Sequence, residues 1–161
     1  MIHIRKAGEK DHDSIWRIIQ EVIAPGDTYV FDPHSSRKQM LDYWCGKDKH
    51  TYVAVLNGIV AGTFILKDNL PDRGSHVANA SYMTLPSFFG KGIGRAMGEF
   101  SLSEALRLGY RALQFNIVVK TNERAIGLWK NLGFEIIGEI PEAFRHPTLG
   151  YVNAYIMWRK L

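Results

Sequence analysis

The sequence predicts an α/β (α+β) fold, in which one mixed sheet is flanked by about four helices. Short segments that alternate apolar and polar residues, as strands do, are interleaved with segments whose apolar residues fall at helical spacing. Asn57-Gly58 is the strongest short hairpin signal in the chain and predicts an antiparallel strand pair. The length of 161 residues, with 46% hydrophobic and 22% charged residues, suits one globular domain over residues 1–161.

The first half of the chain predicts a strand, two helices and the hairpin. Ile15, Ile18, Ile19 and Val22 share one helical face. The segment between the two helices is rich in proline, glycine, aspartate and aromatic residues, which indicates a loop. In chain order, these elements are strand 2–6, helix 10–23, loop 24–34, helix 35–46 and strands 51–57 and 59–66.

The second half alternates strands with helices that end at glycines. Gly109 and Gly133 each follow a helical pattern directly, where glycine commonly ends a helix. Asn122 is a favourable N-cap for the second of these helices. In chain order, the elements are strand 76–85, a helix ending near Leu108, strand 112–119, helix 122–132 and strands 134–140 and 151–159.

Composition and charge narrow the functional class. Cys45 is the only cysteine, which rules out an intrachain disulfide. The first six residues lack the apolar core of a signal peptide, and no apolar run approaches membrane-spanning length. We therefore expect a cytoplasmic protein without a membrane partner. The net charge of +4 is spread over scattered basic residues, so we expect no nucleic-acid partner. The sequence predicts no metal site.

A glycine-rich stretch from Thr84 to Ala96 predicts an anion-binding loop. An extended segment ends at Pro86, glycines follow at alternate positions, and a helical pattern begins at once. Glycines allow tight turns with exposed N–H groups, and the helix N-terminus adds unpaired donors and a positive dipole end. We therefore expect a ligand that carries phosphates.

Two familiar phosphate motifs do not fit this loop. A dinucleotide fingerprint that starts at Gly90 requires glycine or alanine at position 95, which is arginine here. A P-loop requires serine or threonine after its Gly-Lys pair, but Gly92 follows Lys91. An oxidoreductase that uses a dinucleotide is therefore disfavoured.

The second motif, from Asn122 to Phe134, completes a pair that resembles the GNAT acetyltransferase superfamily. That family has R/Q-x-x-G-x-G/A after V-x-P at the end of a strand, matched here from Phe89 to Gly94 after Thr84-Leu85-Pro86. Its second motif, N-x-x-A-x-x-L-Y-x-x-x-G-F, matches 122–134 with Trp129 at the tyrosine position. The resemblance covers essentially the whole chain. It implies a mixed, mostly antiparallel sheet splayed between two strands, and acetyl-CoA as co-substrate.

The resemblance also assigns cofactor contacts residue by residue. Backbone groups of Tyr82 and Thr84 would pair with the pantetheine arm as an added strand does. Asn122 would contact the same arm while capping its helix, and Trp129 would lie near the thiol. The N–H groups that would hold the pyrophosphate belong to Phe89, Gly90, Lys91, Gly92, Ile93 and Gly94.

Two of these positions depart from the family pattern. Phe89 stands where arginine or glutamine is usual, and a phenyl group cannot bond a phosphate. Lys91 or Arg95 would then supply the missing charge. Trp129 replaces a tyrosine often assigned as the acid that protonates the leaving thiolate. Indole donates a hydrogen bond without giving up its proton, so Trp129 is interpreted either as a donor to sulfur or as a core residue.

Asn79 and Asn116 are the candidate catalytic and substrate-binding residues. Both interrupt apolar strand patterns, where asparagine is disfavoured. The amides would either hold a substrate carboxylate and orient the acyl group, or satisfy local backbone where two strands part. Together with Asn122, Gln114 to Asn116 and Phe144 to His146, they resemble the fungal proline-analogue (azetidine-2-carboxylate) N-acetyltransferases. That resemblance implies a small imino-acid acceptor.

The implied reaction is direct attack of a neutral amine on the acetyl thioester in a ternary complex. Tyr29 and Phe31, in loop 24–34, are predicted to wall the acceptor site. A peptide or protein N-acetyltransferase and a non-catalytic CoA-binding sensor remain the alternatives. The family also provides an analogy for a homodimer. Candidate general bases are Glu21, Asp27, Asp32 and His146.

Overall fold

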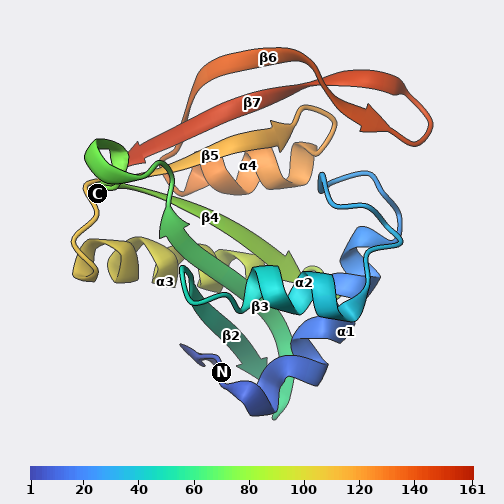
Figure 1. Cartoon of the computed structure of the whole chain (residues 1–161), viewed down its shortest axis with the longest axis vertical. Coiled ribbons are helices and arrows are strands. Elements are labelled where there is room, and N and C mark those ends of the chain that lie inside the picture. Colours follow the sequence, from blue (N-terminus) through green and yellow to red (C-terminus); the bar gives the residue numbers. More distant parts are fainter.

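The structure is a computed structural model that describes all residues from 1 to 161. Its centre is a seven-stranded sheet in the order β1-β2-β3-β4-β5-β7-β6, with four helices packed around it (Figure 1). The strands are β1 Ile2–Lys6, β2 His50–Leu56, β3 Ile59–Asp68, β4 Val77–Thr84, β5 Ala112–Val119, β6 Glu135–His146 and β7 Gly150–Lys160. The helices are α1 His12–Ile23, α2 Arg37–Trp44, α3 Ile93–Arg107 and α4 Glu123–Asn131.

The sheet is antiparallel except where β4 meets β5. These two strands run parallel and pair only through Val77 to Asn79, opposite Ala112 to Gln114. Beyond Asn79 the ladder stops while both strands continue, so β4 and β5 separate toward their carboxyl ends. The predicted mixed, mostly antiparallel and splayed sheet is therefore confirmed. None of the helices combines the length and apolar composition that crossing a bilayer requires.

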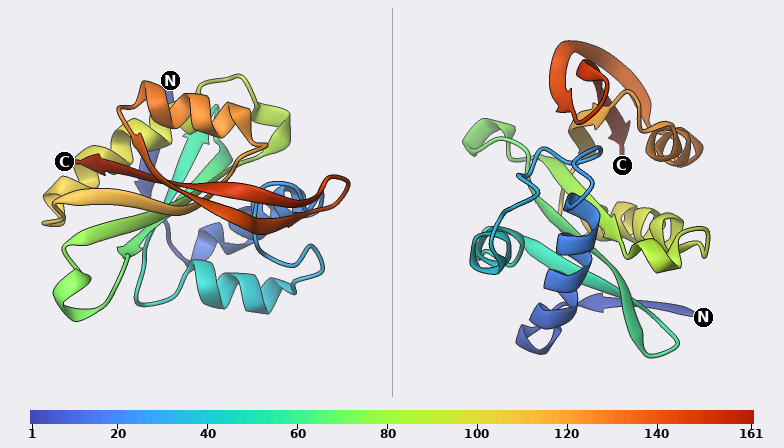
Figure 2. Two further views of the ribbon diagram at one scale, coloured as in Figure 1. Left: turned by 90° about the horizontal axis from the view of Figure 1, so that it is seen from above. Right: turned by 90° about the vertical axis from the view of Figure 1, so that its right-hand side faces the viewer.

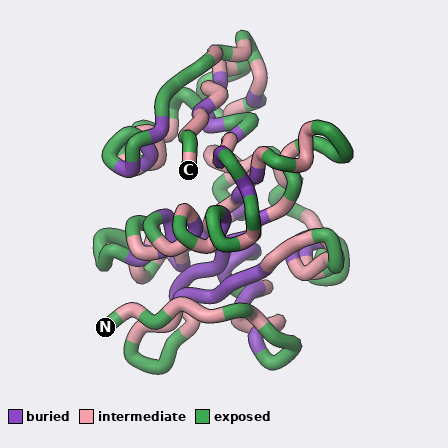
Figure 3. The backbone as a smooth tube through the Cα atoms, turned by 90° about the vertical axis from the view of Figure 1, so that its left-hand side faces the viewer, coloured by how far each residue is buried: buried purple, intermediate pink, exposed green.

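Two apolar layers hold the sheet between its helices. Helices α1 and α2 cover one face and α3 and α4 cover the other (Figure 2). On the first face, α1 buries Ile15, Ile18 and Ile19 against strand residues that include Ile65. The opposite face buries residues of β3, α3 and α4 in a second cluster. The buried residues are accordingly concentrated in the central strands (Figure 3).

Most helices and strands end where turn, stop or cap residues in the sequence predicted. Asn57 and Gly58 have φ values of 52° and 76°, which is the left-handed pair that a type I′ hairpin turn requires. Gly109 and Gly133, with φ values of 94° and 84°, follow the ends of α3 and α4. Asn122 caps α4, because its Oδ1 accepts a hydrogen bond from the Ala125 N–H at 3.3 Å.

Most predicted ends lie within two residues of the observed ones, and four larger differences remain. Strand β6 runs to His146 instead of residue 140, and its pairing with β7 resumes at Phe144 after an irregular stretch. Glu142 sits in that stretch with φ 50°, and its N–H bonds Asn153 Oδ1 at 2.9 Å. The cross-strand partner thus restores a strand that Pro141 interrupts in the sequence pattern. The other three are 3₁₀ turns that were not predicted, at Glu9–Asp11, Asp72–Gly74 and Pro86–Phe88.

Candidate functional site

The glycine-rich loop forms a turn of exposed N–H groups between β4 and α3. Gly90 and Gly92 adopt φ values of 78° and 80°, which a side chain would strain. The first bond of the helix is donated by Ala96 to the Gly92 carbonyl, so the N–H groups of its opening turn have no backbone partner. The N–H groups of Phe89 and Lys91 differ, because they bond Pro86 and Phe88 at 3.1 and 3.3 Å. Of the six N–H groups predicted at 89–94, two are therefore already paired, and the free ones are those of Gly90, Gly92, Ile93 and Gly94.

Strand β4 presents unpaired backbone to the gap beside it. The Leu85 N–H bonds the Ala61 carbonyl at 2.8 Å, which directs Leu85 toward β3. Because alternate residues of an antiparallel strand point their backbone groups to opposite edges, Thr84 and Tyr82 face the other way. At that edge β5 has already separated from β4. The backbone groups of the two residues predicted to pair with an extended ligand therefore have no strand partner at that edge.

A cavity of about 720 Å³ occupies this gap and reaches from the glycine loop to the strand junction. Its lining is drawn from loop 24–34, β3, β4, the glycine loop, β5 and α4, which converge from both halves of the chain. Among the residues predicted to bind the cofactor or the acceptor, only Lys91 does not line it. The predicted residues that do are Tyr29, Phe31, Asn79, Tyr82, Thr84, Phe89, Gly90, Gly92, Ile93, Gly94, Asn116, Asn122 and Trp129.

The cations near the glycine loop are arranged differently from the prediction. Lys91 lies over the ring of Phe88, with its Nζ 4.5 Å from the ring centre. Arg95 lines the cavity but pairs with Glu99 at 2.8 Å. Arg124, at the start of α4, also lines the cavity and stacks its guanidinium 4.3 Å from the centre of the Phe89 ring. Arg124 has no acidic partner, so it is an available cation at this end of the cavity. It stands at an unspecified position of the second motif, so the sequence did not single it out.

Polar side chains gather where β4 and β5 part. Asn79 donates through Nδ2 to the Gln114 carbonyl at 3.0 Å, which satisfies backbone at the last paired position. Asn116 donates to Asn69 Oδ1 at 2.8 Å and accepts from Gln114 Nε2 at 3.0 Å. Asn116 is exposed rather than enclosed by apolar neighbours, which corrects the environment that its strand pattern suggested. Both asparagines line the cavity and retain unused donors or acceptors.

The loop between α1 and α2 closes one side of the cavity with aromatic rings. Tyr29 stacks on Phe31 with 6.1 Å between ring centres, and Phe31 meets Tyr43 of α2 at 5.4 Å. The Tyr29 hydroxyl donates to the backbone carbonyl of Tyr82. Burial raises the pKa of Tyr29 above its ordinary value, so the hydroxyl stays protonated as a donor. A carbonyl oxygen has two lone pairs, so the Tyr82 carbonyl can accept a second hydrogen bond.

Trp129 belongs to an aromatic cluster that backs the cavity. Its ring centre lies 4.7 Å from those of both Tyr82 and Phe115, and the residue is 7% exposed. Its indole N–H makes no hydrogen bond, yet no fully buried side-chain nitrogen or oxygen in the protein lacks a partner. The N–H therefore reaches accessible space, so Trp129 is a core residue with one polar edge open.

No carboxylate, imidazole or thiol lines this cavity. The four candidate bases all lie elsewhere, and three of them have structural partners. Asp32 accepts a hydrogen bond from the His34 N–H at 2.8 Å. His146 accepts from the Leu149 N–H at 3.2 Å, and Glu21 pairs with Arg17 at 3.1 Å. Because Asp27 does not line the cavity either, none of the four can receive a proton directly from a molecule inside it.

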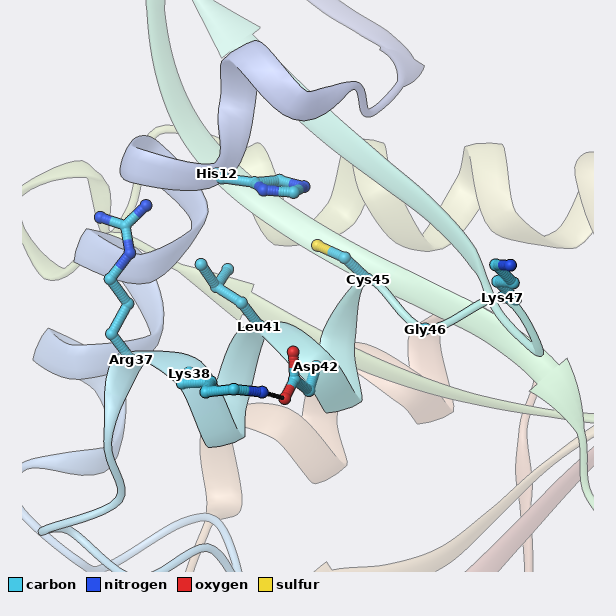
Figure 4. A pocket seen from close by; sticks show the side chains of 8 residues that line it. All are labelled: His12, Arg37, Lys38, Leu41, Asp42, Cys45, Gly46 and Lys47. Atoms are coloured by element: carbon cyan, nitrogen blue, oxygen red, sulfur yellow. Dashed lines mark hydrogen bonds and ion pairs between the residues drawn. The ribbon is translucent and has the colours of Figure 1, made fainter.

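A second cavity, of about 630 Å³, lies between the start of α1 and helix α2 (Figure 4). It contains none of the predicted site residues. Its guanidinium, on Arg37, pairs with Asp13 at 2.7 Å, and Lys38 pairs with Asp42. Burial raises the pKa of the Cys45 thiol, which disfavours the reactive thiolate. The gap between β4 and β5 is therefore the better candidate site.

Comparison with known proteins places the chain in a family. Residues 16–134 match the model of the acetyltransferase (GNAT) family. N-acetyltransferase aca1 of Schizosaccharomyces pombe is 42% identical over 96 residues, which cover 59% of this chain and 46% of aca1. The chain thus spans less than half the length of that relative.

Solved structures are similar to this protein over nearly its whole length. A GCN5-related N-acetyltransferase from Kribbella flavida has a TM-score of 0.94 and 41% identity, over 99% of this chain and 98% of that one. A phosphinothricin acetyltransferase from Sinorhizobium meliloti, solved in complex with AcCoA, has a TM-score of 0.87 and 23% identity, over 99% and 88%. The extent of the family match and the likeness to the Kribbella protein show that this chain belongs to the acetyltransferase (GNAT) family.

Proposed function

We propose that this protein transfers the acetyl group of acetyl-CoA to the amine of a small molecule, such as an amino or imino acid. The observation that carries the proposal is the single cavity along the free edge of β4. It joins a loop of unpaired N–H groups at one end to a cluster of amide side chains at the other. Family membership and the acetyl-CoA complex of the S. meliloti neighbour support acetyl-CoA as co-substrate.

The residues present suit acetyl-CoA at this position. The N–H groups from Gly92 onward would hold the pyrophosphate, with Arg124 supplying the charge that Phe89 lacks. The free backbone edges of Tyr82 and Thr84 would pair with the amides of the pantetheine arm. The acetyl thioester would then approach the junction of β4 and β5, where Asn79 and Asn116 lie.

The closed side of the cavity favours a small acceptor over a peptide. A peptide lying in an open groove needs an accessible channel across the site. Here Tyr29 reaches across to the backbone of Tyr82, and Phe31 and Tyr43 pack behind it. This aromatic wall supports the predicted role of loop 24–34 in shaping the acceptor site.

The lining contains no carboxylate, imidazole or thiol, so the proposed reaction uses water as the proton acceptor. The acceptor nitrogen attacks the thioester carbonyl as the neutral amine, after it has lost its proton to water. The C–N bond forms, the C–S bond then breaks, and CoA leaves as the thiolate. The extra proton on the acylated nitrogen passes through water to the thiolate, which gives the amide and CoA thiol. The Asn79 Oδ1, which has no partner within the protein, would accept a hydrogen bond from that amine and orient its lone pair. Alignment of the two reactants would supply most of the rate.

The proposal is tested by measuring thiol release from acetyl-CoA by the purified protein. The acceptors would be amino acids, imino acids including azetidine-2-carboxylate, polyamines and short peptides with free N-termini. Acetylation of one or more small amines, at rates well above those for peptides, supports the proposal. Peptide-only turnover identifies a peptide N-acetyltransferase, and acetyl-CoA binding without turnover identifies a sensor.

A further inference from the structure

We propose that Lys67 recognises an anionic group of the acceptor and thereby makes the enzyme selective for amines that carry a carboxylate. The inference rests on the proposed function and adds to it a residue that the motifs do not indicate. Lys67 lies near the end of β3, outside both sequence motifs, and lines the cavity. Its proposed role follows from the position of its ammonium group in the cavity.

The sheet register places Lys67 beside the acceptor end. Lys67 is directly opposite Asn79 in the antiparallel ladder between β3 and β4. Side chains of directly opposed residues project from the same face of a sheet, about 5 Å apart at Cβ. Lys67 Nζ also lies 5.9 Å from the centre of the Tyr43 ring, which belongs to the aromatic wall. The ammonium is therefore held between that wall and the amide cluster.

The charge of Lys67 has no ion-pair partner. Asp48 is close enough for Lys67 to lower its pKa, but the main cause of that lowering is Lys49, whose Nζ bonds both Asp48 oxygens at 2.9 and 3.0 Å. The carboxylate of Asp68, the next residue, accepts a hydrogen bond from the Tyr110 hydroxyl at 2.7 Å. No acidic side chain lines the cavity. An unpaired cation in such a site favours an anionic ligand.

Lys67 is too far along the strand to serve the phosphates. Asn79, its partner in the ladder, precedes Thr84 by five residues, which is about 16 Å along a strand. The glycine loop and Arg124 lie beyond Thr84, at the opposite end of the cavity. The two ends therefore carry separate positive charges, one at the phosphate end and one at the acceptor end.

The neighbouring amides complete a site for an amino acid. Asn116 Nδ2 has two N–H groups, of which one is bonded to Asn69, so one remains for a carboxylate oxygen. Asn79 Oδ1 is a free acceptor for the amine. A carboxylate against Lys67 and Asn116 with an adjacent amine against Asn79 matches the charge pattern of an α-amino or α-imino acid. Polyamines lack the anion and would meet the Lys67 charge unfavourably.

The test compares azetidine-2-carboxylate with its neutral carboxamide in the wild type, Lys67→Met, Lys67→Arg and Lys47→Met. We expect Lys67→Met to lower kcat/KM for the carboxylate by roughly 10- to 100-fold relative to the carboxamide, as loss of a charge-assisted bond does. Lys67→Arg should restore most of this preference. Lys47→Met is the matched control, because Lys47 is an exposed lysine that makes no ion pair and does not line the cavity.

A binding measurement separates this inference from the proposed function. Cyclobutanecarboxylate, which has the anion but no amine, would be titrated into the wild type and Lys67→Met in the presence of CoA. Tighter binding to the wild type without acetylation of any small amine would support the anion site while removing the proposed function. An unchanged carboxylate preference in an active Lys67→Met enzyme would overturn the inference alone. Absence of both binding and turnover would overturn both.

Discussion

The guanidinium of Arg124 lies 4.3 Å from the centre of the Phe89 ring, so a residue of α4 brings a cation to the glycine loop. The family motif has arginine or glutamine at position 89, and phenylalanine there removes a phosphate donor. Stacking on an aromatic face holds an arginine in place while leaving its N–H groups available. The guanidinium of Arg124, held on the Phe89 ring, thus supplies a positive charge near position 89, where the family motif has arginine or glutamine and this chain has phenylalanine.

Arg124→Met is expected to raise the KM for acetyl-CoA by roughly 5- to 50-fold with little change in kcat, because it removes a charge-assisted contact to phosphate. Initial rates at varied acetyl-CoA concentration measure this effect. Lys130→Met, which removes an exposed cation from the same helix outside the cavity, should leave the KM unchanged. Equal effects of the two substitutions would show that Arg124 acts only through net charge.

Gly98→Ala is expected to destabilise the fold by about 1–2 kcal/mol, because the added carbon would overpack the contact between α3 and α4. An ideal Cβ at Gly98 would lie 2.5 Å from Leu132 Cδ1 and 3.2 Å from Trp129 Cζ3. Gly98 thus allows α3 to approach α4 closely. Gly94→Ala is the matched comparison one turn away, because its Cβ would have 3.4 Å to the closest atom, Leu128 Cδ2.

Urea denaturation measures both variants. We expect Gly94→Ala to change the free energy of unfolding by less than about 0.5 kcal/mol, since helix propensity favours alanine. If the two alanines proved equally destabilising, close packing at Gly98 would not be the cause.

Asp11→Asn is expected to cost about 2 kcal/mol of stability at pH 7, because Asp11 is a buried carboxylate bonded to Arg5. Its oxygens accept from both Arg5 terminal nitrogens at 2.7 and 2.8 Å and from the Gly8 N–H at 2.9 Å. The hydrogen bonds from Arg5 hold the pKa of Asp11 below its usual value. A lowered pKa stabilises the fold above the ordinary carboxyl pKa, and the contribution is lost as the pH falls through the lowered value.

The difference between the wild type and Asp11→Asn should therefore shrink as the pH falls below about 4. Unfolding at pH 7, 5 and 3 measures the trend. Asp13→Asn breaks the exposed pair with Arg37 and should cost less than about 0.5 kcal/mol. A difference that grew toward acid would contradict the assigned ionisation of Asp11.

Trp129→Phe is expected to lower the free energy of unfolding by about 1–3 kcal/mol while leaving kcat within about threefold, because the ring serves mainly as core. Thermal unfolding and saturating thiol-release assays separate the two effects. A tenfold loss of kcat that Trp129→Tyr recovered would instead identify a proton or hydrogen-bond donor at this position.

The sequence predicted elements with local start and stop signals better than features that depend on distant partners. The cap at Asn122 and the stop at Gly133 depend only on nearby residues, so the sequence predicted them. The far half of β6 depends on pairing with β7, which the irregular stretch at Glu142 hides.

The residues of the candidate site show the same difference between local signals and distant contacts. The glycine loop and the two asparagines interrupt their local patterns, and this made them recognisable as candidates. Arg124 and Lys67 stand in ordinary helix and strand patterns. They become candidates only when folding brings one over Phe89 and the other opposite Asn79. The absence of carboxylate, imidazole and thiol groups from the cavity is likewise a tertiary property.

The central claim is that one cavity aligns acetyl-CoA and a small amine for direct transfer. Initial rates of CoA release, with acetyl-CoA and azetidine-2-carboxylate varied together, test it in the wild type and in Asn79→Ala. We predict intersecting double-reciprocal lines for the wild type, and a raised acceptor KM with an unchanged acetyl-CoA KM for Asn79→Ala. Parallel lines, or an Asn79→Ala enzyme with an unaltered acceptor KM, would contradict the account.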